Sequence, residues 1–118
     1  MADIIEINQK RYFTIDDARG LLPIVQRITE AAYQEVNALS VQISYVGDKK
    51  KKAALEERVR DRFQEWYEKI RKLGCESKGL WLVDFDNGEG YYCWHYPEPH
   101  IEYFHGYFDG YQGRIKIN

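Results

Sequence analysis

The stretch LGCESKGLWLVDFDNGEGYYCWHY, residues 73–96, decides the fold because the spacing of apolar residues changes within it. Before Gly74, apolar residues recur every three or four positions, which is typical of an amphipathic helix. After Gly74, aromatic and apolar residues gather in two short runs, GLWLVDF and YYCWHY, which are rich in strand-forming residue types. Asn87-Gly88 lies between these runs and is the strongest hairpin-turn signal in the chain. We therefore expect a helical part up to residue 73 and a β-rich part from residue 74.

Two long helices are expected before Gly74. The first begins at FTIDDARGLLP, where Thr14 and Asp17 have the spacing of a capping box. Its apolar stripe consists of Ala18, Leu21, Val25, Ile28, Ala32, Val36, Leu39, Ile43 and Val46. Pro23 should either kink this helix or separate a short helix from a longer one. The second stripe consists of Leu55, Val59, Phe63, Trp66, Ile70 and Leu73.

The connection between the helices is short. Gly47 is expected to end the first helix in the left-handed conformation, and Asp48 is expected to cap the second. Two long amphipathic helices joined in this way should fold back as an antiparallel hairpin. The lysine run 49–52 that follows is typical of a solvated turn or of a surface for an anionic partner.

Two further strands are expected after the hairpin turn. Pro97 and Pro99 end the second strand, HIEYF (100–104) forms a third, and RIKI (114–117) is a short edge strand that could pair with IIEI (4–7). The sequence thus predicts an α+β fold in which a long antiparallel helical hairpin packs against a small, mostly antiparallel sheet. We expect a single domain, 1–118, with a mainly helical part (1–73) and a β-rich part (74–118).

Composition excludes several classes of function. No stretch is apolar for the ~18 residues of a membrane span, and the first residues lack the features of a signal peptide, so we expect a cytoplasmic protein. The two cysteines form no CxxC pair, which argues against a zinc knuckle. Residues 74–118 carry 3 Lys or Arg, 7 Asp or Glu and 11 of the 18 aromatic residues. Phosphate would be repelled by this acidic part, so no nucleic-acid partner is expected. The aromatic residues either pack the sheet or receive a cationic or sugar-like ligand.

One possible metal site lies in the second strand. Cys93 and His95 are two residues apart in a predicted strand and therefore face the same side. Two ligands at this spacing could begin a site for a divalent metal, with the remaining ligands drawn from Asp84, Glu98 and His105. The candidate metal ligands are thus Cys93, His105, Glu98 and Asp84; the alternative is that Cys93 is a small buried apolar residue.

A second group of polar residues follows in a glycine-rich loop. His105, Asp109 and Arg114 could be brought together there, since a carboxylate can fix a histidine tautomer and an arginine can hold a carboxylate. The alternative is a structural ion pair of Arg114 with Asp109 or Asp84. Glu98 is held between two prolines in an extended segment. The candidate ligand-binding residues are therefore Asp84, Glu98, His105, Asp109 and Arg114.

Three blocks of the chain resemble a prokaryotic family known as domain of unknown function 2203 (DUF2203). They are FTIDDARGLLP, KGLWLVDFDNGEGYYCWHYPEP and IEYFHGYFDGYQGR. The polar residues that match the family pattern are Asp84, Cys93, Glu98, His105 and Arg114. The sequence departs from the pattern at His95, Pro97 and Phe104, where the family has a basic residue, a glycine and a tryptophan. The resemblance implies no activity.

Two functions remain open from the sequence. The first is a binding or interaction module for a small-molecule or protein ligand, in which the polar cluster fixes the C-terminal loop and the helices pair with a second copy. The second is a small metal-binding protein or hydrolase-like enzyme that uses His105, Glu98, Asp84 and Cys93, with a divalent metal as the cofactor.

Overall fold

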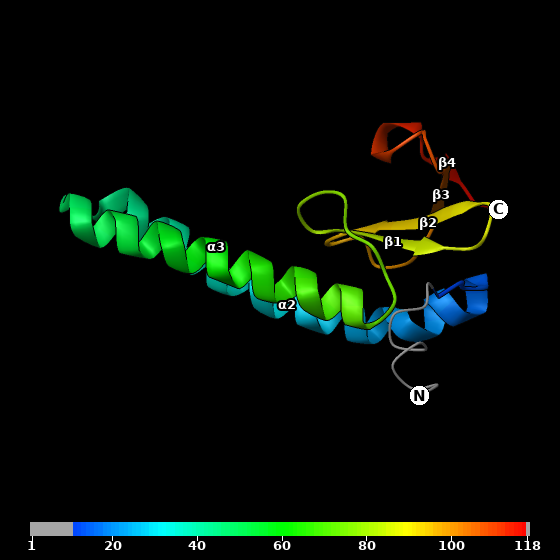
Figure 1. The fold of residues 1–118 in the computed structure, drawn as a ribbon, viewed down its shortest axis with the longest axis horizontal. Helices are drawn as coiled ribbons and strands as arrows, with labels where there is room; N and C mark the ends of the chain where they lie inside the picture. The colour runs from blue at the N-terminus through cyan, green and yellow to red at the C-terminus, as the bar shows by residue number, and fades with distance from the viewer. Residues whose placement is uncertain (1–10, 118) are drawn as a thin grey trace, which may run out of the picture.

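The computed structural model describes residues 11–117. In order, its elements are α2 (Ile15–Tyr45), α3 (Lys49–Lys72), β1 (Leu82–Asp86), β2 (Gly90–His95), β3 (Tyr103–Gly106), the 3₁₀ turn η1 (Tyr111–Gly113) and β4 (Ile115–Lys116). The two helices form a hairpin, and the strands form one antiparallel sheet in the order β1-β2-β3-β4 (Figure 1). The predicted α+β class is confirmed. None of the helices in the described residues combines the length and apolar character needed to pass through a bilayer.

The start of α2 has the predicted capping box. Thr14 Oγ1 accepts a hydrogen bond from the Asp17 backbone N–H over 3.0 Å, and the Asp17 carboxylate accepts one from the Thr14 backbone N–H over 3.1 Å. Pro23 lies inside α2, so a break into two helices is the wrong alternative. The prediction of a left-handed Gly47 is also wrong. Val46 caps α2 in an extended conformation, and the chain runs directly to Asp48, which caps α3 as predicted.

The end of α3 is set by Gly74. Its backbone N–H donates to the Arg71 carbonyl, and the Cys75 N–H donates to the Ile70 carbonyl, which is the Schellman pattern. Gly74 has a φ of +88°, a conformation that glycine adopts without steric penalty. The helix therefore ends where the apolar spacing changes in the sequence.

The strands differ from the prediction mainly at their ends. β1 begins at Leu82 and not at Gly79, because the Leu82 N–H donates to the Gly79 carbonyl in a turn that holds Trp81 at a φ of +62°. β3 begins at Tyr103 and not at His100. β4 pairs with β3. The proposed partner IIEI lies outside the described residues, so that pairing stays a prediction.

One face of the sheet packs on the base of the hairpin. Val83 and Phe85 of β1 and Trp94 of β2 share a buried cluster with Leu22 and Val25 of α2. The far half of the hairpin extends beyond the sheet (Figure 1). The radius of gyration is 16.5 Å, whereas a compact domain of this size has about 13–14 Å.

The junction between sheet and hairpin is aromatic. The indole of Trp81 packs on the rings of Tyr33, Phe63 and Trp66 with centroids 5.7, 5.4 and 5.1 Å away. The aromatic residues of the C-terminal part thus serve largely to pack the sheet and its junction.

Candidate functional site

The opposite face of the sheet carries buried polar side chains. Asp84 of β1 lies directly opposite Cys93 of β2, and Tyr91 of β2 lies opposite His105 of β3, so all four side chains share this face. Asp84 and His105 are 1% exposed and Cys93 is 0% exposed. One ligand atom from each of these three residues lies within 4.8 Å of the other two. Three of the predicted metal ligands are therefore adjacent, one from each of three neighbouring strands.

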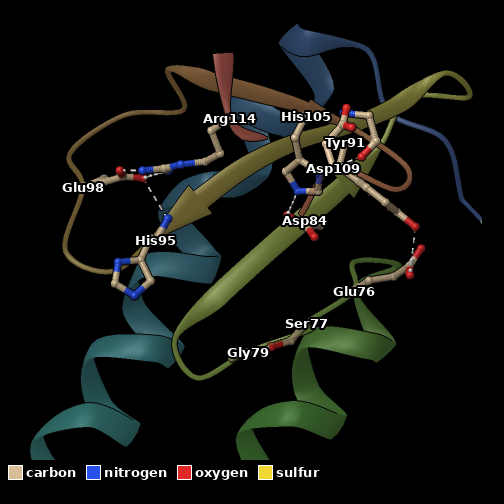
Figure 2. Close-up of polar contacts among 11 residues, drawn as sticks. Glu76, Ser77, Gly79, Asp84, Tyr91, His95, Glu98, His105, Asp109 and Arg114 are labelled. Atoms are coloured by element: carbon tan, nitrogen blue, oxygen red, sulfur yellow. Dashed lines mark hydrogen bonds and ion pairs between the residues drawn. The ribbon is translucent and has the colours of Figure 1, made fainter. Parts of the chain in front are cut away.

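His105 is held on both ring nitrogens, and Figure 2 shows the contact with Asp84. Nδ1 lies 2.8 Å from the Gly106 carbonyl oxygen, and Nε2 lies 3.1 Å from Asp84 Oδ1. A carbonyl oxygen can only accept, so Nδ1 must carry a proton. Nε2 consequently faces the carboxyl group as a second N–H, in an imidazolium, or as a lone pair directed at a carboxyl proton or at a shared cation. When one ring nitrogen donates to a carbonyl in this way, the other nitrogen, here Nε2, is oriented for coordination.

The Asp84 carboxylate is only half satisfied. Oδ1 faces His105, while Oδ2 is buried and accepts no hydrogen bond from any residue between 11 and 117. An unsatisfied buried polar atom is unfavourable by about 1–3 kcal/mol, and more when it is charged. Asp84 Oδ2 is therefore a buried carboxylate oxygen that a proton or a cation would stabilise.

Both cysteines are buried and free. Burial, followed by the charge of Asp84, raises the pKa of the Cys93 thiol far above its usual value. Burial likewise raises the pKa of Cys75, in the apolar core, to about 12. Neither thiol is an activated nucleophile at neutral pH, which argues against the cysteine chemistry of a hydrolase.

Glu98 does not join this cluster. Its Oε1 accepts a hydrogen bond from the His95 backbone N–H over 2.8 Å, and its two oxygens lie 3.1 and 3.0 Å from Arg114 Nη1. The Arg114 guanidinium also lies 4.0 Å from the ring centroid of Tyr103 and 4.2 Å from that of Tyr111. Burial disfavours the charged guanidinium, but the hydrogen bond and charge of Glu98 outweigh it and raise the pKa of Arg114.

The alternative, a structural ion pair of Arg114 with Asp109 or Asp84, is therefore wrong in its partner, because Arg114 pairs with Glu98. Asp109 binds its own loop: its Oδ2 accepts from the Gly106 backbone N–H over 3.1 Å. The five candidate ligand-binding residues thus divide into three structures: Asp84 with His105, Glu98 with Arg114, and Asp109 alone. The charge of Arg114 acts to lower the pKa of the Cys93 thiol, against the larger effect of burial, so the first two structures are neighbours.

His95 is also outside the group of three ligands, although it follows Cys93 by two residues. Its ring packs against Tyr111, with centroids 5.4 Å apart.

Sequence reasoning missed the residues that surround the group of Asp84, Cys93 and His105, namely Glu76, Lys78 and Asp86. Glu76 exchanges both backbone hydrogen bonds with Asp84, and its side chain accepts from the Tyr91 hydroxyl over 3.3 Å. Lys78 Nζ lies 3.8 Å from the centroid of the Tyr91 ring. Asp86, two residues after Asp84 and 1% exposed, accepts a hydrogen bond from the Tyr107 hydroxyl over 2.7 Å. No local pattern signals these contacts, because they join segments 8 to 21 positions apart. The period-2 alternation of β1 was the one available signal for Asp86.

Two surface grooves between residues 11 and 117 lie away from the three buried ligands. One of about 410 Å³ lies between α2 and the segment 94–98 and includes Glu98. Another, of about 650 Å³, lies near the tip of the hairpin and is lined by Val41, Gln42, Tyr45, Val46, Lys51, Ala54, Leu55 and Arg58. Neither groove is lined by Asp84, Cys93 or His105. The cluster is closed to solvent, which disfavours a catalytic role.

Comparison with known families gave one match. The profile described as "Uncharacterized conserved protein (DUF2203)" matches residues 11–117. The comparisons with curated proteins and with solved structures gave no match.

Proposed function

The chain belongs to the DUF2203 family, whose description gives no activity, and we propose that it is an interaction module that pairs with a second copy of itself through the projecting half of its helical hairpin. The main observation behind this proposal is that the segment from Val36 to Gly47 contains no charged residue, although it lies in the projecting half of the hairpin. Exposed helices normally carry a charged face, whereas the centres of protein interfaces are depleted of charge.

The apolar surface of this segment supports the proposal. Val41 is 50% exposed and Tyr45 is 86% exposed, and both line the groove near the tip. Within α3, all of which the structure describes, the buried residues are Trp66 and Ile70, both near the base. In α2 burial ends at Leu39, while Val41 and Tyr45 beyond it are exposed, so the apolar pattern near the tip is only partly covered. A partner would supply the missing cover.

The charges at the ends of the uncharged segment favour a second copy as the partner. Arg62 Nε lies 2.8 Å from Glu35 Oε1, which sets these residues at the same level of the hairpin. Lys51 lies eleven residues before Arg62, and therefore at the level of Val46, eleven residues after Glu35. An antiparallel copy related by a twofold axis near Val41 would place Lys51 of each chain beside Glu35 of the other.

A twofold axis through an uncharged segment also avoids repulsion. Residues near such an axis contact their own counterparts in the second copy, so a charge there would oppose itself. Val41 would contact Val41 of the second copy, and Lys51 and Glu35 would pair at both ends of the uncharged segment.

We further propose that the protein works in the cytoplasm, where its two thiols stay reduced.

Light scattering coupled to size-exclusion chromatography tests the proposal. The wild-type protein should elute at twice the chain mass of 14.1 kDa at micromolar concentration. Val41→Asp places two like charges at the axis and should give a monomer with an unchanged circular dichroism spectrum. Leu80→Asp is the matched control, because Leu80 is 52% exposed but lies outside the hairpin, and it should remain dimeric.

A charge swap tests the orientation. Lys51→Glu should weaken the dimer by about tenfold or less, as expected for an exposed pair, and Lys51→Glu combined with Glu35→Lys should restore it. A monomeric wild-type protein would refute self-association. A dimer that survives Val41→Asp would place the interface elsewhere.

A further inference from the structure

We propose that Asp84, Cys93 and His105 form a closed structural site for one divalent transition metal of the zinc class. Each side chain comes from a different strand, β1, β2 and β3, so a bound ion would join the three strands across the face that the helices do not cover. This site is independent of the hairpin surface proposed for self-association.

The first argument is the direction of the histidine. Nδ1 donates to the Gly106 carbonyl oxygen, which leaves Nε2 as the atom directed at Asp84 and available to a metal. Zinc-bound histidines usually donate their other N–H to a carbonyl or carboxylate in this way, which fixes the tautomer and the ring.

The second argument is the Asp84 carboxylate. Its Oδ2 is buried and accepts no hydrogen bond within the described part of the chain, although Oδ1 lies 3.1 Å from His105 Nε2. A cation between the three side chains would engage Oδ1, Oδ2 or both. With both oxygens bound, the three residues would supply the four donors that a closed zinc site requires.

The third argument is the charge balance. Zinc with one carboxylate, one thiolate and one neutral imidazole has no net charge, and a buried group without net charge avoids most of the desolvation penalty. Binding would release the Cys93 proton to solvent and form a sulfur–metal bond. The carboxylate of Asp86, buried on the same face, adds negative charge that favours a cation, while the charge of Arg114 is offset by Glu98.

The mixed donor set indicates the type of metal. Thiolate and imidazole ligands suit zinc and cobalt, whereas calcium and magnesium prefer oxygen ligands alone. The triad is buried, and the groove beside Glu98 does not reach it. A closed site of this kind stabilises a fold and leaves no open position for a substrate.

The alternative is a metal-free pair in which a proton lies between His105 Nε2 and Asp84. It satisfies His105 but leaves Asp84 Oδ2 without a hydrogen bond from any residue between 11 and 117, and Cys93 is then a protonated thiol beside the carboxyl group. The two possibilities differ in stoichiometry and spectrum, which can be measured on the intact protein.

The test is to refold the full chain with zinc or cobalt(II), remove loosely bound ions with a chelator, and measure the metal content. We expect one zinc per chain. The cobalt form should show the near-ultraviolet absorption band of a thiolate–cobalt bond. Cys93→Ser should remove the band and weaken zinc binding by at least about a hundredfold. Cys75→Ser is the matched control, since Cys75 is also buried and free but belongs to the apolar core. That variant should keep both the band and the zinc affinity.

A second measurement covers the case in which Cys93→Ser does not fold. X-ray absorption of the wild-type zinc form should show one sulfur neighbour at about 2.3 Å and the other neighbours, nitrogen or oxygen, at about 2.0–2.2 Å. A wild-type protein that retains no zinc after chelation overturns the proposal. It is also overturned by bound zinc without a sulfur neighbour, or by a cobalt band that survives Cys93→Ser and disappears in Cys75→Ser.

Discussion

Trp66 Nε1 donates a hydrogen bond over 2.8 Å to Thr29 Oγ1 in the buried seam between α3 and α2. Thr29 is fully buried and Trp66 nearly so, and the sheet packs against this level of the hairpin. A buried indole N–H requires a partner because water cannot reach it. This hydrogen bond therefore fixes the register of the two helices at the base from which the rest of the hairpin projects.

Thr29→Val should destabilise the fold by about 1–3 kcal/mol, because it leaves the indole N–H of Trp66 unsatisfied while filling nearly the same volume. Urea unfolding followed by tryptophan fluorescence measures the change in the free energy of unfolding. Thr29→Ser keeps the hydroxyl and loses one methyl group, so it should be the milder change. If the serine variant proves as unstable as the valine variant, packing and not the hydrogen bond sets the stability at this position.

Arg114→Lys should loosen the loop of residues 106–113, which precedes Arg114. A lysine cannot reproduce the planar contact with the rings of Tyr103 and Tyr111 while also bonding the Glu98 carboxylate. We expect a loss of about 1–3 kcal/mol in the free energy of unfolding, the range for hydrogen bonds to charged groups. Amide hydrogen exchange over residues 106–113 should become faster.

Arg60→Lys is the control for this substitution, since Arg60 is exposed on α3. It should leave both stability and exchange unchanged within about 0.5 kcal/mol. Equal exchange in the two variants would mean that Asp109 and the loop backbone hold the segment without Arg114.

Local signals in the sequence predicted most of the fold. The capping box of Thr14 and Asp17, the cap at Asp48 and the hairpin turn at Asn87-Gly88 each depend on residues within three or four positions, and all three are confirmed. The left-handed Gly47 was wrong because Val46 already ends α2 in an extended conformation, which the composition of the connection does not reveal.

The candidate site was only partly predictable because it depends on strand register. Alternation correctly places Cys93 on one face of β2, but which histidine joins it depends on the pairing of β2 with β3, and that pairing brings in His105 and leaves His95 beside Tyr111. The pairing of Glu98 with Arg114 joins residues 16 positions apart across an irregular segment. No periodic pattern in the sequence encodes such a contact.

The free energy of unfolding should fall at alkaline pH, in part because the Cys75 thiol ionises more readily in the unfolded chain. Burial raises its pKa from 9.0 to about 12 in the folded protein. Between these two values the unfolded chain has lost the thiol proton and the folded chain has kept it, so raising the pH favours unfolding. The stabilising contribution is complete below pH ~9 and is lost as the pH approaches ~12.

The Cys75→Ala variant separates this effect from the titration of lysines and tyrosines. Its free energy of unfolding should fall less steeply than that of the wild type between pH 9 and 11, as measured by urea titrations at several pH values. Parallel slopes would show that Cys75 ionises equally in both states. The folded wild-type protein should also react only slowly with a thiol reagent at pH 8, because both cysteines are buried.

Gly90→Ala should disturb the sheet at the pairing that carries His105. A Cβ atom at Gly90 would lie 2.6 Å from the His105 carbonyl oxygen and 2.6 Å from Cζ of the Phe104 ring. The ring can rotate away, but the backbone oxygen cannot move without shifting β3, so we expect a loss of about 1–3 kcal/mol on urea unfolding. Gly79→Ala is the control, because its Cβ would lie at ordinary contact distances from Leu82, 3.6 Å from Cδ2 and 3.9 Å from Cβ. Because β3 carries one of the three proposed ligands, Gly90→Ala should also weaken zinc binding while Gly79→Ala should not. Equal unfolding midpoints for the two variants would mean that β2 and β3 can separate at this pair without strain.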